Sequence, residues 1–268
     1  MKIIALTVAF CPASQLARCL FEYRKNATIV ADKHIVVMGH YPINLEKNNR
    51  DIKMIVQAYG QAELLDPGRN IGSAQSQWWA LRQLNLGSDS YWLNIDPDSA
   101  CRDRGWDYAG KLVLDHDPNC IVISCRSPLV EKFNTDRNQK FNLMEIGKSD
   151  VTYGTLDNPT PFNLSLWRYS FFEEIGGIPQ LGEMWGEVEA GVCYYAKQKD
   201  KYHAYLMDYM EDESGKFMQD KQLVEWKDLN MRTAEPDRFA GNYQEYIAYR
   251  YPELLAMNTH ILDNTEFK

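Results

Sequence analysis

The sequence predicts an α/β protein in which helices flank a mostly parallel β-sheet. Short apolar segments rich in β-branched and aromatic residues alternate with amphipathic helical stretches along the first half of the 268-residue chain. The strand segments are apolar almost throughout, which is typical of strands buried on both faces, as parallel strands are. Open sheets of this kind bind ligands beyond the carboxyl ends of their strands, so the residues that follow each strand are the candidates for a site.

The elements of the first half follow from hydrophobic periodicity and turn signals. The expected strands are Lys2–Ala9, His34–Met38, Asp51–Val56, Tyr91–Ile95 and Ile121–Cys125. Three helices are expected in this half. The first begins at Ser14, which can cap it, the second runs from about Gly72 to Leu84, and the third lies around Trp106–Leu114. This order of elements predicts a parallel sheet with helical crossovers.

The second half is more irregular. From Ser127 to Pro161 the sequence is polar and loop-like, and a long irregular segment inside a compact domain is usually functional. A strand-like segment, Leu164–Phe172, the turn at Gly176-Gly177 and a helix from Glu187 to Lys197 are expected to follow. The last expected helices lie near Asp220–Met231 and Tyr243–Ala248. We therefore expect one main domain, residues 1–204, followed by a C-terminal helical extension, residues 205–268.

Composition restricts the class of protein. The formal net charge of −8 argues against a protein whose main task is to bind nucleic acid, which requires clustered Lys and Arg. The six cysteines form no CxxC pair, so reduced, buried thiols in the cytoplasm are expected. The apolar run Ile3–Phe10 is followed by Cys11–Ser14, a poor cleavage site for a signal peptide, and no stretch is long enough to span a membrane.

The sharpest local feature is an apolar strand that ends in two carboxylates, Asp96 and Asp98, separated by Pro97. In extended geometry alternate side chains point the same way, so both carboxylates can address one point in space. Hard oxygen ligands in this position suit Mg²⁺ or Mn²⁺, with coordination positions left for a diphosphate. The other interpretation is a simple turn, because Asp and Pro are good turn formers.

A second feature lies upstream, where the segment Arg69–Ala74 leads into a helix. Gly72 at the helix start permits close backbone approach, and the free N–H groups and the dipole there favour phosphate. A plain Asn cap with a tolerated glycine explains the same residues.

Together, an Asn-x-Gly-x-Ala helix start and an apolar strand that ends in Asp-x-Asp resemble the GT-A glycosyltransferases, especially the family 2-like group. The resemblance implies that residues 1–126 form the nucleotide-sugar-binding half and residues 127–204 the acceptor half. It implies that the end of the first strand lies against the nucleotide base, that the segment from Asp66 to Gly72 flanks the nucleotide, and that the Asp pair holds metal and diphosphate. The implied donor-binding residues are Thr7, Ala9, Phe10, Asp66, Arg69, Asn70, Gly72 and Asp96.

The second half resembles the family too, in the segment Leu164–Arg168 and the Gly176-Gly177 turn. The family then usually presents a Glu-Asp pair at a helix start, with one carboxylate as general base on the acceptor hydroxyl. Here the stretch reads Trp185-Gly186-Glu187-Val188-Glu189, so the match is imperfect. Glu187 or Glu189 is the candidate base of an inverting transfer, with Glu187 preferred, and a retaining mechanism stays open. Trp185 and Gly186 are expected near the acceptor.

Many GT-A enzymes add a third metal ligand downstream, often His. The corresponding region, Tyr205–Asp212, contains no His, and its candidates are Asp208, taken as the third ligand, and Asp212. For any one of these residues, a place in a solvated acidic stretch is the favoured interpretation.

Two other functions and several acceptors stay open. A haloacid-dehalogenase-type phosphotransferase also places Asp-x-Asp after a strand, but usually after its first strand, and a GT-A-like module could bind a nucleotide sugar without turnover. The expected donor is a nucleotide-diphosphate sugar, most often a UDP-sugar in this family, and the default acceptor is a saccharide. A modified phage DNA base is a minority option, with Lys132, Arg137 and Lys140 as phosphate contacts. No integral membrane association is expected.

Overall fold

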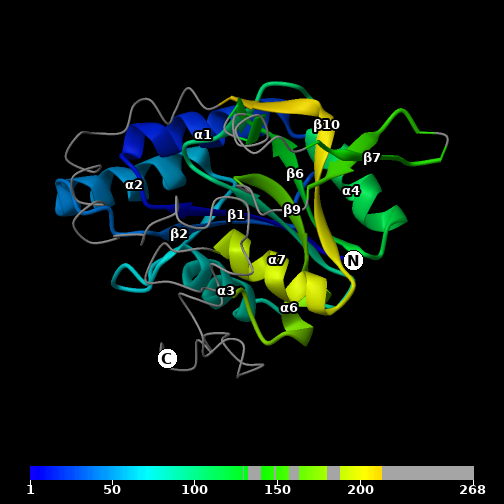
Figure 1. Cartoon of the computed structure of the whole chain (residues 1–268). Coiled ribbons are helices and arrows are strands. Elements are labelled where there is room, and N and C mark those ends of the chain that lie inside the picture. Colours follow the sequence, from blue (N-terminus) through cyan, green and yellow to red (C-terminus); the bar gives the residue numbers. More distant parts are fainter. Residues whose placement is uncertain (129, 132–139, 148, 157–162, 180–187, 213–268) are drawn as a thin grey trace, which may run out of the picture.

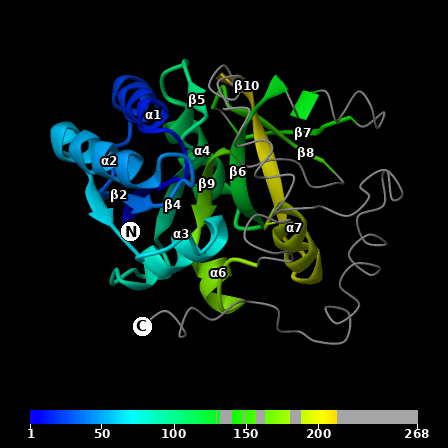
Figure 2. The same ribbon diagram turned by 90° about the vertical axis from the view of Figure 1, so that its left-hand side faces the viewer.

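A computed structural model describes residues 1–128, 130–131, 140–147, 149–156, 163–179 and 188–212. One mixed β-sheet forms the middle layer, with helices on both faces (Figures 1 and 2). The described helices are α1 Ala13–Asn26, α2 Leu45–Tyr59, α3 Ser73–Arg82, α4 Trp106–His116, α6 Tyr169–Glu174 and α7 Val188–Gln198. The described strands are β1 Ile3–Ala9, β2 Lys33–Met38, β3 Glu63–Leu65, β4 Tyr91–Ile95, β5 Ala100–Cys101, β6 Cys120–Arg126, β7 Asn142–Glu145, β8 Thr152–Thr155, β9 Leu164–Arg168 and β10 Tyr202–Asp212.

The strand order across the sheet is β3-β2-β1-β4-β9-β6-β10-β8-β7, with β5 paired to β10. Strands β1 to β4 are mutually parallel, and β10 runs parallel to β6. Strand β9 lies antiparallel between β4 and β6. The prediction of a mostly parallel sheet flanked by helices is therefore confirmed, with β9 as the strand that reverses direction at its centre.

Alternate side chains of each strand define the two faces of the sheet. Helices α1 and α2 pack on the face that carries Val36 and Met38, and α4 covers the same face further along, against Leu93. Helices α3, α6 and α7 lie on the opposite face, against Ile35 and Val37 (Figure 1). Both faces of the central strands are thus buried, which explains their continuous apolar sequence.

An aromatic cluster joins β4 to its neighbours. The Trp92 side chain is fully buried and stacks on Trp167 of β9, with ring centroids 5.2 Å apart. The ring of Phe172 in α6 packs edge-on against Trp92 at 5.0 Å. The Trp92 indole N–H donates to Oε1 of Gln77 in α3 at 3.2 Å, so its one polar group is satisfied.

One predicted strand is wrong. The segment Asp51–Val56 lies inside helix α2, which ends at Gly60 with a positive φ of 69°. Ile52 and Val56 are four residues apart and share the buried face of this helix, so their spacing is helical and not alternating.

The start of α1 also differs from the prediction. Ser14 does not cap the helix, since the N-cap is Pro12 and the helix begins at Ala13. The Ala13 N–H instead donates to Oδ1 of Asn48 in α2 at 2.9 Å. A side chain distant in the sequence therefore supplies the partner that a local cap would have supplied.

Two further expectations for the second half need correction. The polar stretch 127–161 contains the antiparallel pair β7 and β8, and is not a loop throughout its described part. The boundary between residues 204 and 205 divides strand β10, so residues 205–212 belong to the sheet and not to a helical extension. The helices expected near 220–231 and 243–248 lie outside the described residues.

The cysteine prediction is confirmed in that all six cysteines are free and buried. None of the helices in the described part of the chain combines the length and the apolar character that a membrane crossing requires.

Replacement of Trp92 by alanine is expected to lower the free energy of unfolding by about 3–5 kcal/mol, because it removes a fully buried indole and leaves a cavity. Urea unfolding followed by circular dichroism measures this change, and Tyr108→Ala, at an exposed position of α4, is the control. A loss below about 1 kcal/mol for Trp92→Ala would contradict the central place of this cluster.

Candidate functional site

Four loops meet at the edge of the sheet where β1, β2, β3 and β4 end. Because these strands are parallel and adjacent, their carboxyl ends lie side by side. The loops contain Phe10–Pro12 after β1, Gly39–Asn44 after β2, Asp66–Gly72 after β3, and Asp96–Ser99 after β4. Most of the donor-binding residues expected from the sequence lie in these loops.

The first two loops are held in direct backbone contact. The Gly39 N–H donates to the Ala9 carbonyl at 3.2 Å. A Cβ atom on Gly39 would lie 2.6 Å from the backbone nitrogen of Phe10, so only glycine fits at this position. The Phe10 ring then packs edge-on against Tyr41 at 5.6 Å. The end of β1 and the start of the β2 loop therefore form one unit.

Asn48 of α2 fixes the turn that follows β1. Its Oδ1 accepts the Ala13 N–H, and its Nδ2 donates to the Cys11 carbonyl at 3.0 Å. Asn48 is 8% exposed, and both halves of its amide have partners in this turn. Sequence reasoning missed Asn48 because α2 itself was not predicted.

The β3 loop is connected to the β2 loop through His40 and Asp66. His40 Nε2 lies 2.7 Å from Asp66 Oδ1, which also accepts the Gly68 N–H at 2.8 Å. Burial by itself would raise the pKa of Asp66, but the hydrogen bonds from Gly68 and His40 and the nearby Lys53 charge outweigh it, so the pKa lies below its ordinary value. Asp66 is therefore ionised at neutral pH and oriented by its neighbours.

The start of α3 has the geometry expected of an anion-accepting helix end. The Asn70 side chain accepts the Gly72 N–H at 2.9 Å, which closes a local turn. Gly72 is the N-cap, with φ of 84° and no side-chain cap bond, so its conformation is one that favours glycine. Arg69 is exposed beside this turn.

Asp96 and Asp98 lie in a turn between β4 and β5. The Ser99 N–H donates to the Asp96 carbonyl at 3.0 Å, so the segment is a four-residue turn and not the extended strand assumed from the sequence. Both carboxylates are partly exposed. The turn interpretation is correct, and it still leaves the two acidic side chains at the sheet edge.

The Asp96–Ser99 turn rests on α1 and adjoins the end of β1. The Cys19 thiol lies 3.6 Å from the Asp96 carbonyl oxygen. Burial raises the pKa of Cys19, and the carboxylates of Asp96 and Asp98 raise it further. Asp98 has the same effect on the pKa of Cys11, after burial and Cys19, so it lies near the residue that follows Phe10. The structure therefore brings the acidic turn and the end of β1 together.

Strand β10 supports this turn through Glu211. The carboxylate of Glu211 is buried and accepts the Ser99 hydroxyl at 2.5 Å and the Asn163 amide at 3.2 Å. Asn163 in turn accepts the Asp96 N–H on its carbonyl at 3.0 Å. Glu211 was not a candidate from the sequence. The only sequence feature that pointed to Glu211 was its position in the acidic segment Tyr205–Asp212.

The expected metal ligands are only partly brought together. Asp208, the third ligand expected from the sequence, is exposed on β10, whereas Glu211 points to the turn and Asp212 pairs with Arg18 and Arg102. Within the described residues, no three His, Cys, Asp or Glu side chains form a group that could hold a metal ion. Two partly exposed carboxylates nevertheless suit Mg²⁺ or Mn²⁺, which commonly complete their coordination with water and substrate phosphates.

The remaining site residues lie elsewhere. Thr7 is fully buried within β1, below the sheet edge, and its Oγ1 has no hydrogen-bond partner. Glu189 lies in the first turn of α7, partly exposed, and its carboxylate contributes, after burial, to the raised pKa of Cys193. The expected residues Trp185, Gly186 and Glu187 fall outside the described part of the chain.

Sequence comparison gives no relative, since no known protein family and no curated protein matches the chain. Comparison of structures does give matches. The chain superposes on the mannosyltransferase PcManGT from Pyrobaculum calidifontis, solved with GDP-Man and Mn²⁺, at a TM-score of 0.57 and 13% identity. The match covers 95% of this chain and 73% of that one.

A second match is GalNAc-T7, solved with UDP, GalNAc and Mn²⁺, at a TM-score of 0.59 and 12% identity. It covers all of this chain but 53% of GalNAc-T7, so the chain spans about half of that structure. The fold is therefore that of the GT-A glycosyltransferases, as the resemblance in the sequence implied.

Alanine substitutions at Glu211 and at Asp208 are expected to have different effects on stability and on Mn²⁺ binding. Glu211→Ala removes the acceptor of two hydrogen bonds behind the acidic turn, so it is expected to lower the free energy of unfolding by about 1–3 kcal/mol and to weaken Mn²⁺ binding. Asp208→Ala, on the exposed side of the same strand, is expected to change neither. Denaturant unfolding and calorimetric titration with Mn²⁺ measure both effects. Loss of Mn²⁺ binding in Asp208→Ala alone would restore Asp208 as the ligand.

Proposed function

We propose that this protein is a metal-dependent glycosyltransferase that moves a sugar from a nucleotide-diphosphate donor to an acceptor hydroxyl. The observation that carries the proposal is the Asp96–Ser99 turn, which holds two carboxylates beside the end of β1 at the sheet edge of a GT-A fold. Neighbours with this fold were solved with GDP-Man and Mn²⁺ or with UDP and Mn²⁺, which supports a nucleotide sugar and a divalent ion for this chain.

Asp96 and Asp98 are proposed to hold Mn²⁺ or Mg²⁺ together with the donor diphosphate. When bound, the ion neutralises charge that develops on the leaving nucleoside diphosphate. The backbone of Asp96 is held without the ion, because its N–H donates to the Asn163 carbonyl and its own carbonyl accepts the Ser99 N–H and lies beside the Cys19 thiol. A site that is already arranged avoids the cost of ordering these groups during binding.

The other three loops are proposed to bind the nucleotide. Ala9 and Phe10 lie at the end of β1 beside Gly39, Asp66 is ionised and held by His40, and α3 begins after Gly72, where the helix dipole and the backbone N–H groups of a helix start favour phosphate. Arg69, Asn70 and Gly72 belong to this helix start. Thr7 is proposed to support the donor site from inside β1 without touching the nucleotide, because its side chain is fully buried. The most frequent donor in the family, a UDP-sugar, is our first choice.

Glu187 or Glu189 is proposed as the general base of an inverting transfer. A carboxylate can take the proton of the incoming hydroxyl while the sugar's anomeric carbon is attacked on the face opposite the leaving group. Glu189 lies in the first turn of α7, and Glu187 directly precedes this helix in the sequence. Trp185 and Gly186, just before Glu187, are proposed to contact the acceptor. A saccharide is the proposed acceptor.

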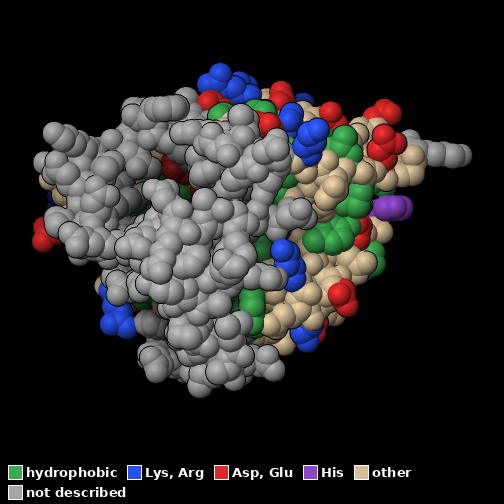
Figure 3. Space-filling view, in the orientation of Figure 1, with side chains coloured by type: hydrophobic (Ala, Val, Ile, Leu, Met, Phe, Trp, Pro, Cys, Tyr) green, Lys and Arg blue, Asp and Glu red, His purple; other side chains and the backbone are tan. Residues whose placement is uncertain are grey.

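A DNA base as acceptor is less well supported. On the part of the described surface that is visible in Figure 3, Lys and Arg side chains lie among Asp and Glu side chains. The formal net charge of −8 does not favour phosphate binding, and Lys132 and Arg137 lie outside the described residues. A cytoplasmic location is proposed because all six thiols are free and buried. A module that binds a nucleotide sugar without turnover stays the second candidate, because Val188 replaces the second acid of the usual pair.

Calorimetric titration with a panel of UDP- and GDP-sugars is expected to show binding of one donor in the presence of Mn²⁺ and none in EDTA. Asp98→Ala is expected to weaken that binding by about tenfold or more, because a charge-assisted contact is lost. Asp103→Ala, an exposed acid near the same turn, is the matched control. Absence of binding by every nucleotide sugar in Mn²⁺ would contradict the proposal.

The two candidate bases are distinguished by Glu187→Gln and Glu189→Gln, which keep size and polarity. The variant at the base is expected to lose about 10²–10⁴-fold in kcat, with donor affinity unchanged, while the other keeps most of its activity. Turnover is measured as release of the nucleoside diphosphate with the acceptor present. Donor binding without turnover in the unmodified protein would favour the second candidate function.

A further inference from the structure

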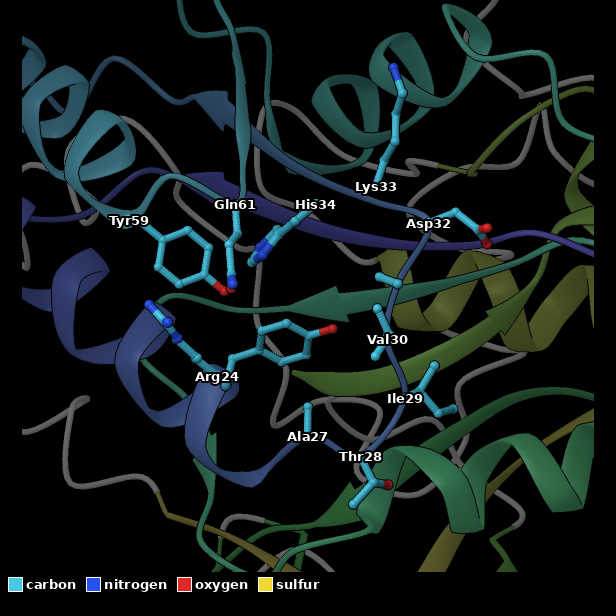
Figure 4. A pocket seen from close by; sticks show the side chains of 12 residues that line it. Arg24, Ala27, Thr28, Ile29, Val30, Asp32, Lys33, His34, Tyr59 and Gln61 are labelled. Atoms are coloured by element: carbon cyan, nitrogen blue, oxygen red, sulfur yellow. The ribbon is translucent and has the colours of Figure 1, made fainter.

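A cavity of about 580 Å³ opens at the opposite end of the sheet from the acidic turn (Figure 4). Its walls come from the last turn of α1, the loop from Ala27 to Lys33, the start of β2, the end of α2 and Gln61. His34 begins the buried part of β2, and His40 follows the carboxyl end of the same strand. Six residues of extended chain separate the two, or about 20 Å. The cavity is therefore separate from the proposed donor site.

His34 forms the inner wall of this cavity. It shares the face of β2 that carries Val36 and Met38, and it is 6% exposed. Rings of Tyr23 and Tyr59 pack edge-on against it, at 5.1 and 5.6 Å. Both ring nitrogens are buried, and neither has a hydrogen-bond partner in the part of the chain that the structure describes. Burial lowers the pKa of His34 to about 4, so the ring is neutral at pH 7 and keeps one N–H donor without a partner.

Three further polar side chains line the cavity, and of these Arg24 and Gln61 are exposed to solvent whereas Tyr59 is half-buried. Within the described residues, the Arg24 guanidinium forms no ion pair, and the Gln61 amide and the Tyr59 hydroxyl form no hydrogen bond. In Figure 4, Arg24, His34, Tyr59 and Gln61 gather on one side of the cavity, while Lys33 and Asp32 point away from them. Each of the four gathered side chains can donate a hydrogen bond, and one carries a positive charge.

The opposite wall of the cavity is fixed by the protein itself. Asp107 of α4 is fully buried and accepts the backbone N–H groups of Thr28 and Ile29 as well as the Thr28 hydroxyl. Asp32 accepts the Ile3 N–H at 2.7 Å and returns its own N–H to the Ile3 carbonyl at 2.8 Å. The loop is thus held in shape without a ligand, which indicates a preformed cavity.

We propose that this cavity binds a small molecule that carries a phosphate or carboxylate group, with the oxyanion bound by the four gathered side chains, Arg24, His34, Tyr59 and Gln61. An oxyanion only accepts hydrogen bonds, and it therefore matches a group of side chains that can all donate. A buried polar group without a partner is unfavourable, and a ligand that supplies acceptors removes this cost. A phenylalanine at position 34 would fill the same space without leaving a buried N–H group unpaired.

The size of the cavity indicates that the anion is part of a larger molecule. A volume of about 580 Å³ lies within the usual range of small-molecule sites, about 300–1,000 Å³, and far exceeds a single phosphate. The rings of Tyr23, Tyr59 and His34 provide apolar surface for the remainder of the molecule. Phenyl phosphate combines an oxyanion with a flat apolar group, and benzyl alcohol is its neutral counterpart.

The test is a titration of the full chain, labelled with ¹⁵N, with phenyl phosphate, inorganic phosphate and benzyl alcohol, followed by NMR. We expect the side-chain resonances of Gln61 and His34 to shift with phenyl phosphate, more weakly with inorganic phosphate, and not with benzyl alcohol. Arg24→Met and Tyr59→Phe are expected to weaken binding, the former by about tenfold or more. Lys25→Met, at the next position of α1 and outside the cavity, is the control.

His34→Phe distinguishes a binding role from a purely structural one. It is expected to fold with equal or greater stability and to lose phenyl phosphate binding, whereas a structural histidine would change stability only. Binding of benzyl alcohol as tight as that of phenyl phosphate, no binding of either phosphate probe, or unchanged affinity in Arg24→Met would overturn the proposal. Metal-dependent binding of nucleotide sugars is expected to be unchanged in all these variants, so this proposal and the proposed function can fail independently.

Discussion

The antiparallel pairing of β4 with β9 positions the acidic turn, and the candidate site depends on it. The pairing runs from Tyr91 opposite Arg168 to Ile95 opposite Leu164, and the bond from the Asp96 N–H to the Asn163 carbonyl extends it by one residue. The register of this pairing therefore fixes the position along the sheet at which Asp96 begins the turn. Because β9 also pairs with β6, the second half of the chain determines where the carboxylates of the first half lie.

The same pairing explains why the turn needs support from β10. Where β4 stops, the Asp96 N–H is still paired to Asn163, but the polar side chains of Ser99 and Asn163 at this buried edge need partners of their own. The Ser99 hydroxyl and the Asn163 amide both donate to the buried Glu211 carboxylate, which is thereby shared between the turn and the segment before β9. A buried carboxylate is tolerated only with such donors, and Glu211 has them. The acidic turn and its support thus form one hydrogen-bonded unit.

Short-range sequence patterns predict the individual strands and helices that carry the site, but not the contacts between residues that are distant in the sequence. The strands β1, β2, β4 and β6 and the helices α3 and α4 have periodicities that are visible in short windows, and the Asp pair follows one of these strands directly. Helix α2 was taken for a strand because Ile52, Ile55 and Val56 are β-branched, although their spacing is helical. Asn48 and Glu211 could not be found from the sequence, since each acts on a partner 35 or more residues away. The turn geometry at Asp96 was one of two readings that its residue types allowed.

Strand β2 connects the proposed donor site at one end with the cavity around His34 at the other, but we expect no coupling between the two sites through this strand. Coupling requires an element with two arrangements whose balance both ligands alter. From Lys33 to Met38, β2 is paired to β1 without a register shift, and Val36 and Met38 are buried beneath α1 and α2. Such a strand has one arrangement. A ligand in the cavity is therefore expected to add stability to the folded chain through its own binding and to leave donor affinity as it was.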